Sequence, residues 1–175
     1  MTRPSRAVIT IIAVVELLAV ALWACGLVTL GAVVAPIVFR VVPSPGSADA
    51  MTLVFRRFDT IAITCAAVAL VAEAAFAMRG GRVLRLDVVR GICLALAAAL
   101  AIAVGAWVSP GIAALHAQGA IRHVGELGAA MERLHTLAEG LAKGELLLLL
   151  IVFGLTVVKA TRPPVDGTPA ANSAL

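Results

Sequence analysis

Four long apolar runs constrain this chain more than any other feature of its sequence. We place the predicted spans at residues 7–39, 59–78, 89–108 and 144–160 of the 175-residue chain. The hydrocarbon core of a bilayer is about 30 Å thick, so a helix of about 20 apolar residues crosses it. Because 62% of the residues are hydrophobic, a soluble core of this length cannot bury them. The runs therefore predict an all-α fold, a polytopic membrane four-helix bundle.

The first and last runs depart from the length of an ideal span. The first would form a helix of about 50 Å, which either protrudes from the membrane or bends, and Pro36 is the obvious place for a bend. The last has only a short apolar centre, residues 146–158. An amphipathic segment over residues 115–143 precedes it, with an apolar stripe at helical spacing made by Val124, Leu127, Met131, Leu134, Ala138 and Leu141. We expect this outer helix to stand before the fourth span or to be continuous with it.

These elements give one membrane domain over residues 1–160, and residues 161–175 read as a disordered tail because they are rich in Pro and small residues. On the polar side of the amphipathic segment, Arg122 with Glu126 and Glu139 with Lys143 are predicted helical ion pairs.

The distribution of charge predicts the orientation. With four spans, both termini and the segment between the second and third spans share one side. That side holds Arg3, Arg6, Arg79, Arg82, Arg85, Arg90, Lys159 and Arg162 against Asp87 and Asp166. On the other side, Arg40, Arg56, Arg57, Arg122, Arg133 and Lys143 are balanced by Asp49, Asp59, Glu126, Glu132, Glu139 and Glu145. The positive-inside rule then places both termini in the cytoplasm, and we expect a bacterial inner (plasma) membrane.

Glu16 and Glu73 are the candidate site, because each is a lone charge within an apolar stretch. A carboxylate at the centre of a spanning helix costs about 2.5–3.5 kcal/mol, so it usually faces the protein interior. Both lie in the same half of the membrane, on helices expected to be antiparallel neighbours. Together they would share a proton or hold a cation. The structural alternative is that Glu73 reaches the interface while Glu16 stays protonated and hydrogen-bonded.

The third span repeats small residues on two stripes, Ala95–Ala99–Ala103 and Ala97–Ala101–Gly105. Such a helix packs closely on two sides, which predicts a central place in the bundle. The competing use of the stripes is an interface with a second copy of the chain.

Histidines are absent from the predicted spans, which excludes a haem or copper site built from intramembrane imidazoles. On the amphipathic segment, Glu132, His135 and Glu139 share one helical face and are candidate ligands for a divalent metal, or else a solvated face with ion pairs. No catalytic or nucleotide-binding motif is present, so we expect neither an enzyme nor a bound cofactor. The net charge of +4 comes without a basic run interleaved with aromatics, so nucleic acid is not an expected partner.

A family resemblance rests on several short motifs. Trp23 and Gly26, followed by the segment from Val34 through Pro36 to Phe39, resemble the opening of the transmembrane protein 205-like family, a domain of unknown function. Phe58 matches the Phe that opens the second span of that family, Pro110 begins its Pro-x-Ile-x-x-Leu motif, and Leu134-His135 resembles its Leu-His pair. The resemblance covers most of residues 22–155 and implies a four-span domain. The chain departs from the family at His116, Met131, Ala138 and Ala142.

A more distant similarity links the bundle to CopD-type copper-resistance membrane domains and their haem-binding relatives. Since the spans contain no histidine, that chemistry does not carry over. Two functional hypotheses follow: cation, proton or metal handling through Glu16 and Glu73, or a non-transporting scaffold that acts by helix packing. The expected partners are the lipid bilayer and either a second copy of the chain or another membrane protein.

Overall fold

The computed structural model describes residues 5–78 and 85–161, and within them the fold consists of helices joined by short turns, with no strand, as the sequence predicts. Six α-helices and two π-helical turns make up four rods. The helices are α1 (Arg6–Val28), α2 (Ala35–Val41), α3 (Gly46–Ala77), α4 (Arg85–Ala103), α5 (Ser109–Ala117) and α6 (Gly125–Thr161). The predicted tail lies outside the described residues, apart from its first residue, which ends α6.

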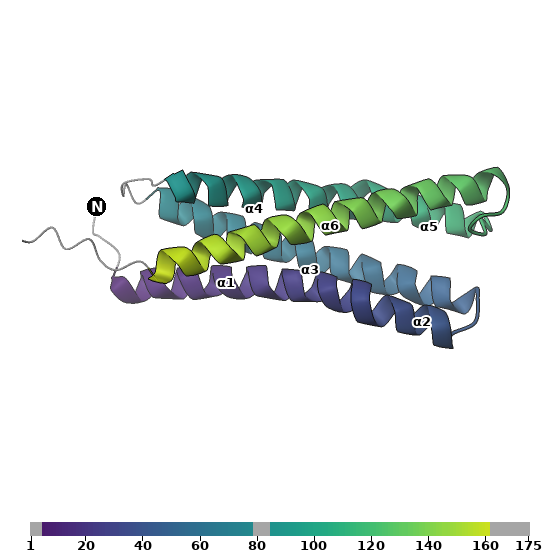
Figure 1. Cartoon of the computed structure of the whole chain (residues 1–175), viewed down its shortest axis with the longest axis horizontal. Coiled ribbons are helices and arrows are strands. Elements are labelled where there is room, and N and C mark those ends of the chain that lie inside the picture. The colour runs from purple at the N-terminus through teal and green to yellow at the C-terminus, as the bar shows by residue number, and fades with distance from the viewer. Residues whose placement is uncertain (1–4, 79–84, 162–175) are drawn as a thin grey trace, which may run out of the picture.

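The four rods run up and down in an elongated bundle (Figure 1). Contacts join α1 to α3, α3 to α4, α4 to α6, and α6 back to α1, so each rod packs against two neighbours. The first residues of α1 and the last residues of α6 lie at the same end. Four helical stretches, Ala7–Val41, Gly46–Ala77, Arg85–Ala117 and Gly125–Lys159, are long and apolar enough to cross a membrane. The chain is therefore an integral membrane protein by the length and composition of its helices.

Two rods pass through a proline without ending. In each, a π-helical turn ends two residues before the proline: Thr29–Val34 before Pro36, and Val104–Val108 before Pro110. The last N–H of the first π turn is that of Ala35, which donates to the carbonyl of Leu30. A proline has no N–H to donate and its ring crowds the preceding turn. The wider π turn accommodates that interruption, and the helical direction continues on the far side.

The observed helices are longer than the predicted spans. The helix α3 begins at Gly46, so the second span does not start at residue 59 but continues a helix begun in the polar turn. The third rod extends through α5 to Ala117. The amphipathic segment is continuous with the fourth span from Gly125 onward, because α6 runs without a break from Gly125 to Thr161, whereas residues 115–124 form the end of α5 and the turn before α6.

Small side chains fill the bundle interior around a few large ones. Trp23, Leu94, Leu149 and Val152 are fully buried there among Ala62, Ala66, Ala69, Ala97, Ala98 and Ala101. Alanines let the helix backbones approach closely, which is the usual way that helices pack in lipid. The outer faces are just as apolar, with Leu18, Leu22 and Val71 among the mostly exposed side chains, as expected of helices that face lipid.

The third span does not occupy the central place that its two small-residue stripes predict. Ala97 and Ala101 are buried against neighbouring helices, but Ala95 and Ala99 are exposed. The reason is geometric: in a four-membered ring of helices each helix has an outer face, and the stripe with Ala95 and Ala99 falls on the outer face of α4.

Candidate functional site

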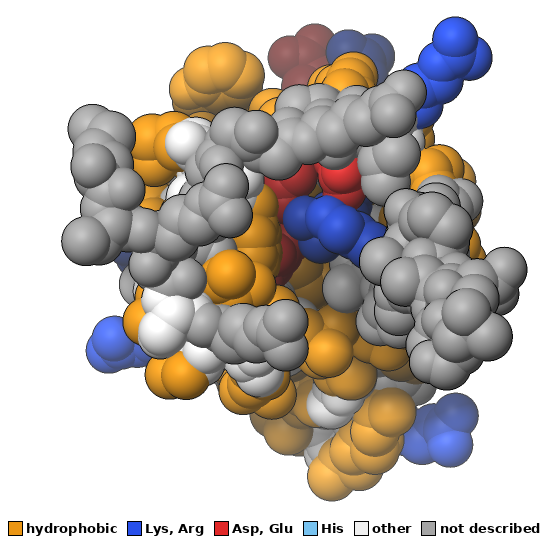
Figure 2. Space-filling view, turned by 90° about the vertical axis from the view of Figure 1, so that its left-hand side faces the viewer, with side chains coloured by type: hydrophobic (Ala, Val, Ile, Leu, Met, Phe, Trp, Pro, Cys, Tyr) orange, Lys and Arg blue, Asp and Glu red, His pale blue; other side chains and the backbone are white. Residues whose placement is uncertain are grey.

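Glu16 and Glu73 converge in the structure, but on an arginine that lies between them. Arg90 Nη1 lies 3.3 Å from Glu16 Oε1, and Arg90 Nη2 donates to Glu73 Oε2. Arg90 and Glu16 are each only 4% exposed, and the Glu73 carboxylate lies against Gly91. Viewed onto this end of the bundle, basic and acidic side chains meet in a hollow between the helices (Figure 2). We call Glu16, Glu73 and Arg90 the ion-pair cluster.

The ion-pair cluster draws on all four rods. Glu16 belongs to α1, Glu73 to α3 and Arg90 to α4, and the hydroxyl of Thr156 on α6 accepts from Arg90 Nη1 at 3.4 Å. Closer to the end of the bundle, Lys159 donates to Asp87 at 2.6 Å. Glu16 Oε1 and Arg90 Nε are buried without a hydrogen-bond partner in the part of the chain that the structure describes. The cluster thus joins the four rods through polar contacts, and some of its hydrogen-bonding atoms have no partner.

Sequence reasoning missed the role of Arg90, which it assigned to the polar segment between the second and third spans. The residue lies one turn inside α4, which begins at Arg85, and it is buried. A signal was present: a basic residue at the start of an apolar run, at the depth expected for two intramembrane carboxylates, is the partner that their burial requires.

A second buried carboxyl group lies deeper in the bundle. Glu145 is 2% exposed and accepts a hydrogen bond from the indole Nε1 of Trp23, with the two atoms 2.5 Å apart. Charge counting placed Glu145 among the outer acidic residues, which is wrong, because α6 is one helix and Glu145 falls within its interior face. Trp and Glu are complementary when buried, since an indole N–H needs an acceptor.

Two of the residues that carry the family resemblance contact each other. A Cβ atom built on Gly26 would lie 2.3 Å from Cε2 of Phe58, so only a glycine leaves room for this ring. Trp23, one turn before Gly26, is fully buried. Pro36 and Pro110 each follow a π turn, while Phe39 and His135 line a cavity at the end of the bundle away from the ion-pair cluster.

A family model described as "Domain of unknown function (DUF4149)" matches residues 18–121, more than half of the chain. The chain belongs to the DUF4149 family. No curated protein and no solved structure matches it. The DUF4149 match contains Trp23, Gly26, Phe58, Glu73 and Arg90, and it ends before α6 begins. Since the family description names no activity, the function of this DUF4149 chain has to be inferred from the residues of its site.

The outer segment of this DUF4149 chain forms ion pairs rather than a metal site. Arg122 lies in the turn before α6 and pairs with Glu132 through two hydrogen bonds, not with the predicted Glu126. Hydrogen bonding to Glu132 raises the pKa of the Arg122 guanidinium above its usual value. The predicted pair of Glu139 and Lys143 is present at 2.7 Å.

The predicted metal ligands do not form a metal-binding group. Within residues 5–78 and 85–161, no group of three or more His, Cys, Asp or Glu side chains is placed to hold a metal ion. Glu132 and Glu139 are instead paired with basic residues, and the exposed ends of such pairs are the solvated face that the same spacing also predicts.

Proposed function

We propose that this protein handles protons at the ion-pair cluster. The observation that supports it is the position of Arg90 between two carboxylates. A guanidinium carries one positive charge, whereas two ionised carboxylates carry two negative charges. In an interior of low dielectric constant the remaining negative charge is costly, and a proton on one of the carboxyl groups removes it. A metal cation is disfavoured here because Arg90 occupies the place that such a cation would take.

The location of the cluster fits that role. It lies in the interior of the bundle near the end where α1 begins and α6 ends. By the positive-inside rule we propose that this is the cytoplasmic end, and we keep the bacterial inner membrane as the proposed location. Its polar atoms are not fully hydrogen-bonded to one another, as the buried Glu16 Oε1 atom shows. An unsatisfied acceptor of this kind favours protonation of the group or access by water.

Carboxyl infrared spectroscopy tests the proposal. Purified protein in lipid nanodiscs, titrated between pH 5 and pH 9, is expected to show a protonated carboxyl band that disappears on deprotonation. Glu16→Gln or Glu73→Gln should remove that band or shift its midpoint, whereas Glu126→Gln, an exposed glutamate at the start of α6, should leave it unchanged. Because the buried Glu145 and Asp59 carboxyl groups contribute bands of their own, the signal of the cluster is the difference between the native and variant spectra. An identical titration in the Glu16→Gln plus Glu73→Gln variant would rule out the cluster as the proton site.

Proton flux is measured separately in proteoliposomes with an internal pH dye and an imposed potassium diffusion potential. The native protein is expected to pass protons faster than empty liposomes and faster than the double glutamine variant. Since that variant leaves Arg90 unpaired, Glu16→Gln, Glu73→Gln and Arg90→Gln combined provide a charge-neutral control. Its helicity and elution from a sizing column check that loss of flux is not loss of fold. Equal proton flux in all samples would show that the protein does not transport protons.

The second candidate function is a non-transporting scaffold that acts by helix packing. It is favoured by the exposed small residues Ala95 and Ala99 on α4, which offer a close-packing face without a partner within the described chain. The resemblance to the transmembrane protein 205-like family and to CopD-type domains stays a prediction and adds no activity to either candidate. Crosslinking from a cysteine placed at Ala99 would detect a second copy or another protein on this face.

A further inference from the structure

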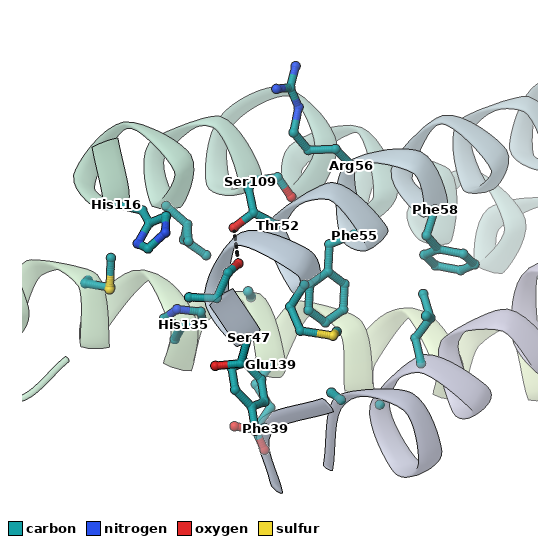
Figure 3. A pocket seen from close by; sticks show the side chains of 18 of the residues that line it. Phe39, Ser47, Thr52, Phe55, Arg56, Phe58, Ser109, His116, His135 and Glu139 are labelled. Atoms are coloured by element: carbon teal, nitrogen blue, oxygen red, sulfur yellow. Dashed lines mark hydrogen bonds between the residues drawn. The ribbon is translucent and has the colours of Figure 1, made fainter. Parts of the chain in front are cut away.

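A large cavity lies at the end of the bundle away from the ion-pair cluster. Its volume is about 1010 Å³, and most of its lining comes from α2, α3, α5 and α6 (Figure 3), with Leu27 from α1 and Ala101 from α4. Most of its lining is apolar, including Leu27, Met51, Phe55, Phe58 and Ala101. It reaches inward from the polar turns to Glu145, in the interior of the bundle. This size and composition are typical of sites that bind small organic molecules.

Two carboxyl groups face this cavity without a basic partner. Glu145 reaches it from α6 and Asp59 from α3, and the two are close enough to interact electrostatically. The Oδ2 atom of Asp59 is buried and has no hydrogen-bond partner among the described residues. Neither carboxyl group forms an ion pair with any Lys, Arg or His that the structure describes. The deep part of the cavity therefore has two carboxyl groups that no basic side chain neutralises, and a bound cation would provide the counter-charge that a proton otherwise supplies.

The neighbouring side chains hold the two carboxyl groups in place. Trp23 donates to Glu145, and the Ser109 hydroxyl hydrogen-bonds to the Asp59 carboxyl group. The Asp59 side chain also lies against Gly105, where an added Cβ would come within 3.3 Å of it. Both acids are thus positioned by contacts from other helices, which is the arrangement that a preorganised site needs.

The lining also contains basic side chains, but none of these forms an ion pair with Asp59 or Glu145: Arg40, Arg56, Arg122, His116 and His135. The part of the cavity beside the two acids therefore suits an organic cation better than an anion or a simple acyl chain. The ring of Phe55 points into the cavity, while the guanidinium of Arg56 points away from it (Figure 3). Aromatic faces attract cations and also pack against apolar groups. An acyl chain would fill the apolar space but leave Asp59 and Glu145 without a counter-charge. An anion would be repelled by both.

From these observations we propose that the cavity binds a lipophilic organic cation, with its positive charge beside Asp59 and Glu145 and its apolar body against Phe55, Phe58 and Met51. The site is independent of the proton function proposed above, because Glu16 precedes Trp23 by seven residues in α1, which corresponds to about 10 Å along the helix. A negative result for proton handling therefore does not contradict cation binding in the cavity, and the reverse also holds.

The probe for the test is tetraphenylphosphonium, added to the purified full-length protein in nanodiscs and followed by calorimetry. Fluorescence of Trp23 in a Trp107→Phe background gives a second readout beside Glu145. Saturable binding is expected. Asp59→Asn and Glu145→Gln should each weaken it at least tenfold. Triphenylphosphine oxide, a neutral compound with a similar apolar body, should bind at least tenfold more weakly than the cation.

Matched controls separate charge recognition from general disruption. Glu139→Gln changes a carboxylate that also lines the cavity but is already paired with Lys143, so binding should change less than twofold. Glu16→Gln should also leave it unchanged. Asp59→Asn keeps the hydrogen bond between Trp23 and Glu145, so it remains informative even if Glu145→Gln fails to fold. Equal binding of the neutral compound, or unchanged binding in Asp59→Asn, would overturn the proposal and favour a lipid chain as the occupant.

Discussion

Two buried contacts at the scale of single residues explain why particular residue types stand in α1. Trp23 donates its indole N–H to Glu145, and Gly26 leaves room for the ring of Phe58. Both contacts join residues far apart in the sequence and lie on the stripe of α1 that also carries Glu16. This stripe also contains Ala19, between Glu16 and Trp23, and it is the face of α1 that is buried in the bundle. Each contact gives a substitution whose effect depends on one interaction.

Replacing Trp23 with Phe is expected to destabilise the protein by about 1–3 kcal/mol, because a buried carboxyl group loses its donor while the apolar ring is largely retained. Trp107→Phe is the matched control: Trp107 is 76% exposed on the outer surface, so its loss should have little effect. Denaturant unfolding in mild detergent, followed by circular dichroism, measures the difference. Equal stability of the two variants would show that the hydrogen bond contributes nothing.

Gly26→Ala is expected to cost about 1–3 kcal/mol, since the new methyl group overlaps the ring of Phe58 in a packed interior. Phe58→Leu, combined with Gly26→Ala, should recover part of that loss by removing the ring edge. Gly154→Ala on α6 meets no atom within 4 Å and should be neutral or stabilising. Thermal unfolding of the native protein, Gly26→Ala, Phe58→Leu, the double variant and Gly154→Ala tests this, and an additive double variant would argue against direct contact.

The two proline-containing rods show how an element tolerates an interruption. Pro36 and Pro110 each come second in the helix that resumes after a π turn. The sequence predicts a bend or break at such a position, since proline removes one backbone donor. It does not predict that the chain absorbs the defect by widening one turn. In the bundle both helices continue because their apolar faces remain packed or in lipid beyond the proline.

Pro36→Ala restores an N–H at residue 36 and removes the ring that crowds the preceding turn. We expect the π turn at Thr29–Val34 to tighten to an α-helical turn, so that amide exchange over residues 29–36 slows. Hydrogen–deuterium exchange with mass spectrometry, on protein in nanodiscs, reports this directly. The unaltered segment over α4 serves as an internal reference. Faster exchange over residues 29–36 would mean that the proline stabilises the π turn rather than causing it.

At the scale of the whole molecule, the bundle has two polar regions separated by an apolar layer. The ion-pair cluster lies near the end where the described chain begins and ends, and the cavity opens at the other. Between them lie Ala69, Leu94, Ala98 and Leu149, all buried. This apolar layer separates the proposed proton site from the proposed cation site. The orientation of the bundle then decides which site faces the cytoplasm.

The orientation that we propose from the positive-inside rule is tested by reporter fusions. We expect a reporter inserted at Gly81, between α3 and α4, to be active only if it functions in the cytoplasm, and a reporter at Gly119, between α5 and α6, to show the opposite behaviour. Each site is fused to an alkaline phosphatase, which is active outside the cytoplasm, and to a fluorescent protein, which is active in the cytoplasm. All four fusions must indicate the same orientation. A periplasmic signal at Gly81 would invert the bundle and place the cavity on the cytoplasmic side.

The sequence by itself determined the class of the fold and identified the candidate site residues. Long apolar runs leave a helix as the only way to satisfy every backbone hydrogen bond in lipid, so four spanning helices were predictable. The cost of a buried charge singled out Glu16 and Glu73. Motif residues such as Gly26 and Phe58 were visible as well, although their contact with each other was not.

Only the tertiary structure decided how these residues are partnered. Arg90 pairs with Glu16 and Glu73 because three helices converge at one depth, and hydropathy does not encode the rotation of each helix about its axis. Glu145 became an interior residue because α6 is continuous and turns that side chain toward Trp23. The cavity beside Asp59 exists because the rods leave space between them at one end. Such features depend on side chains distant in sequence, so no local pattern predicts them.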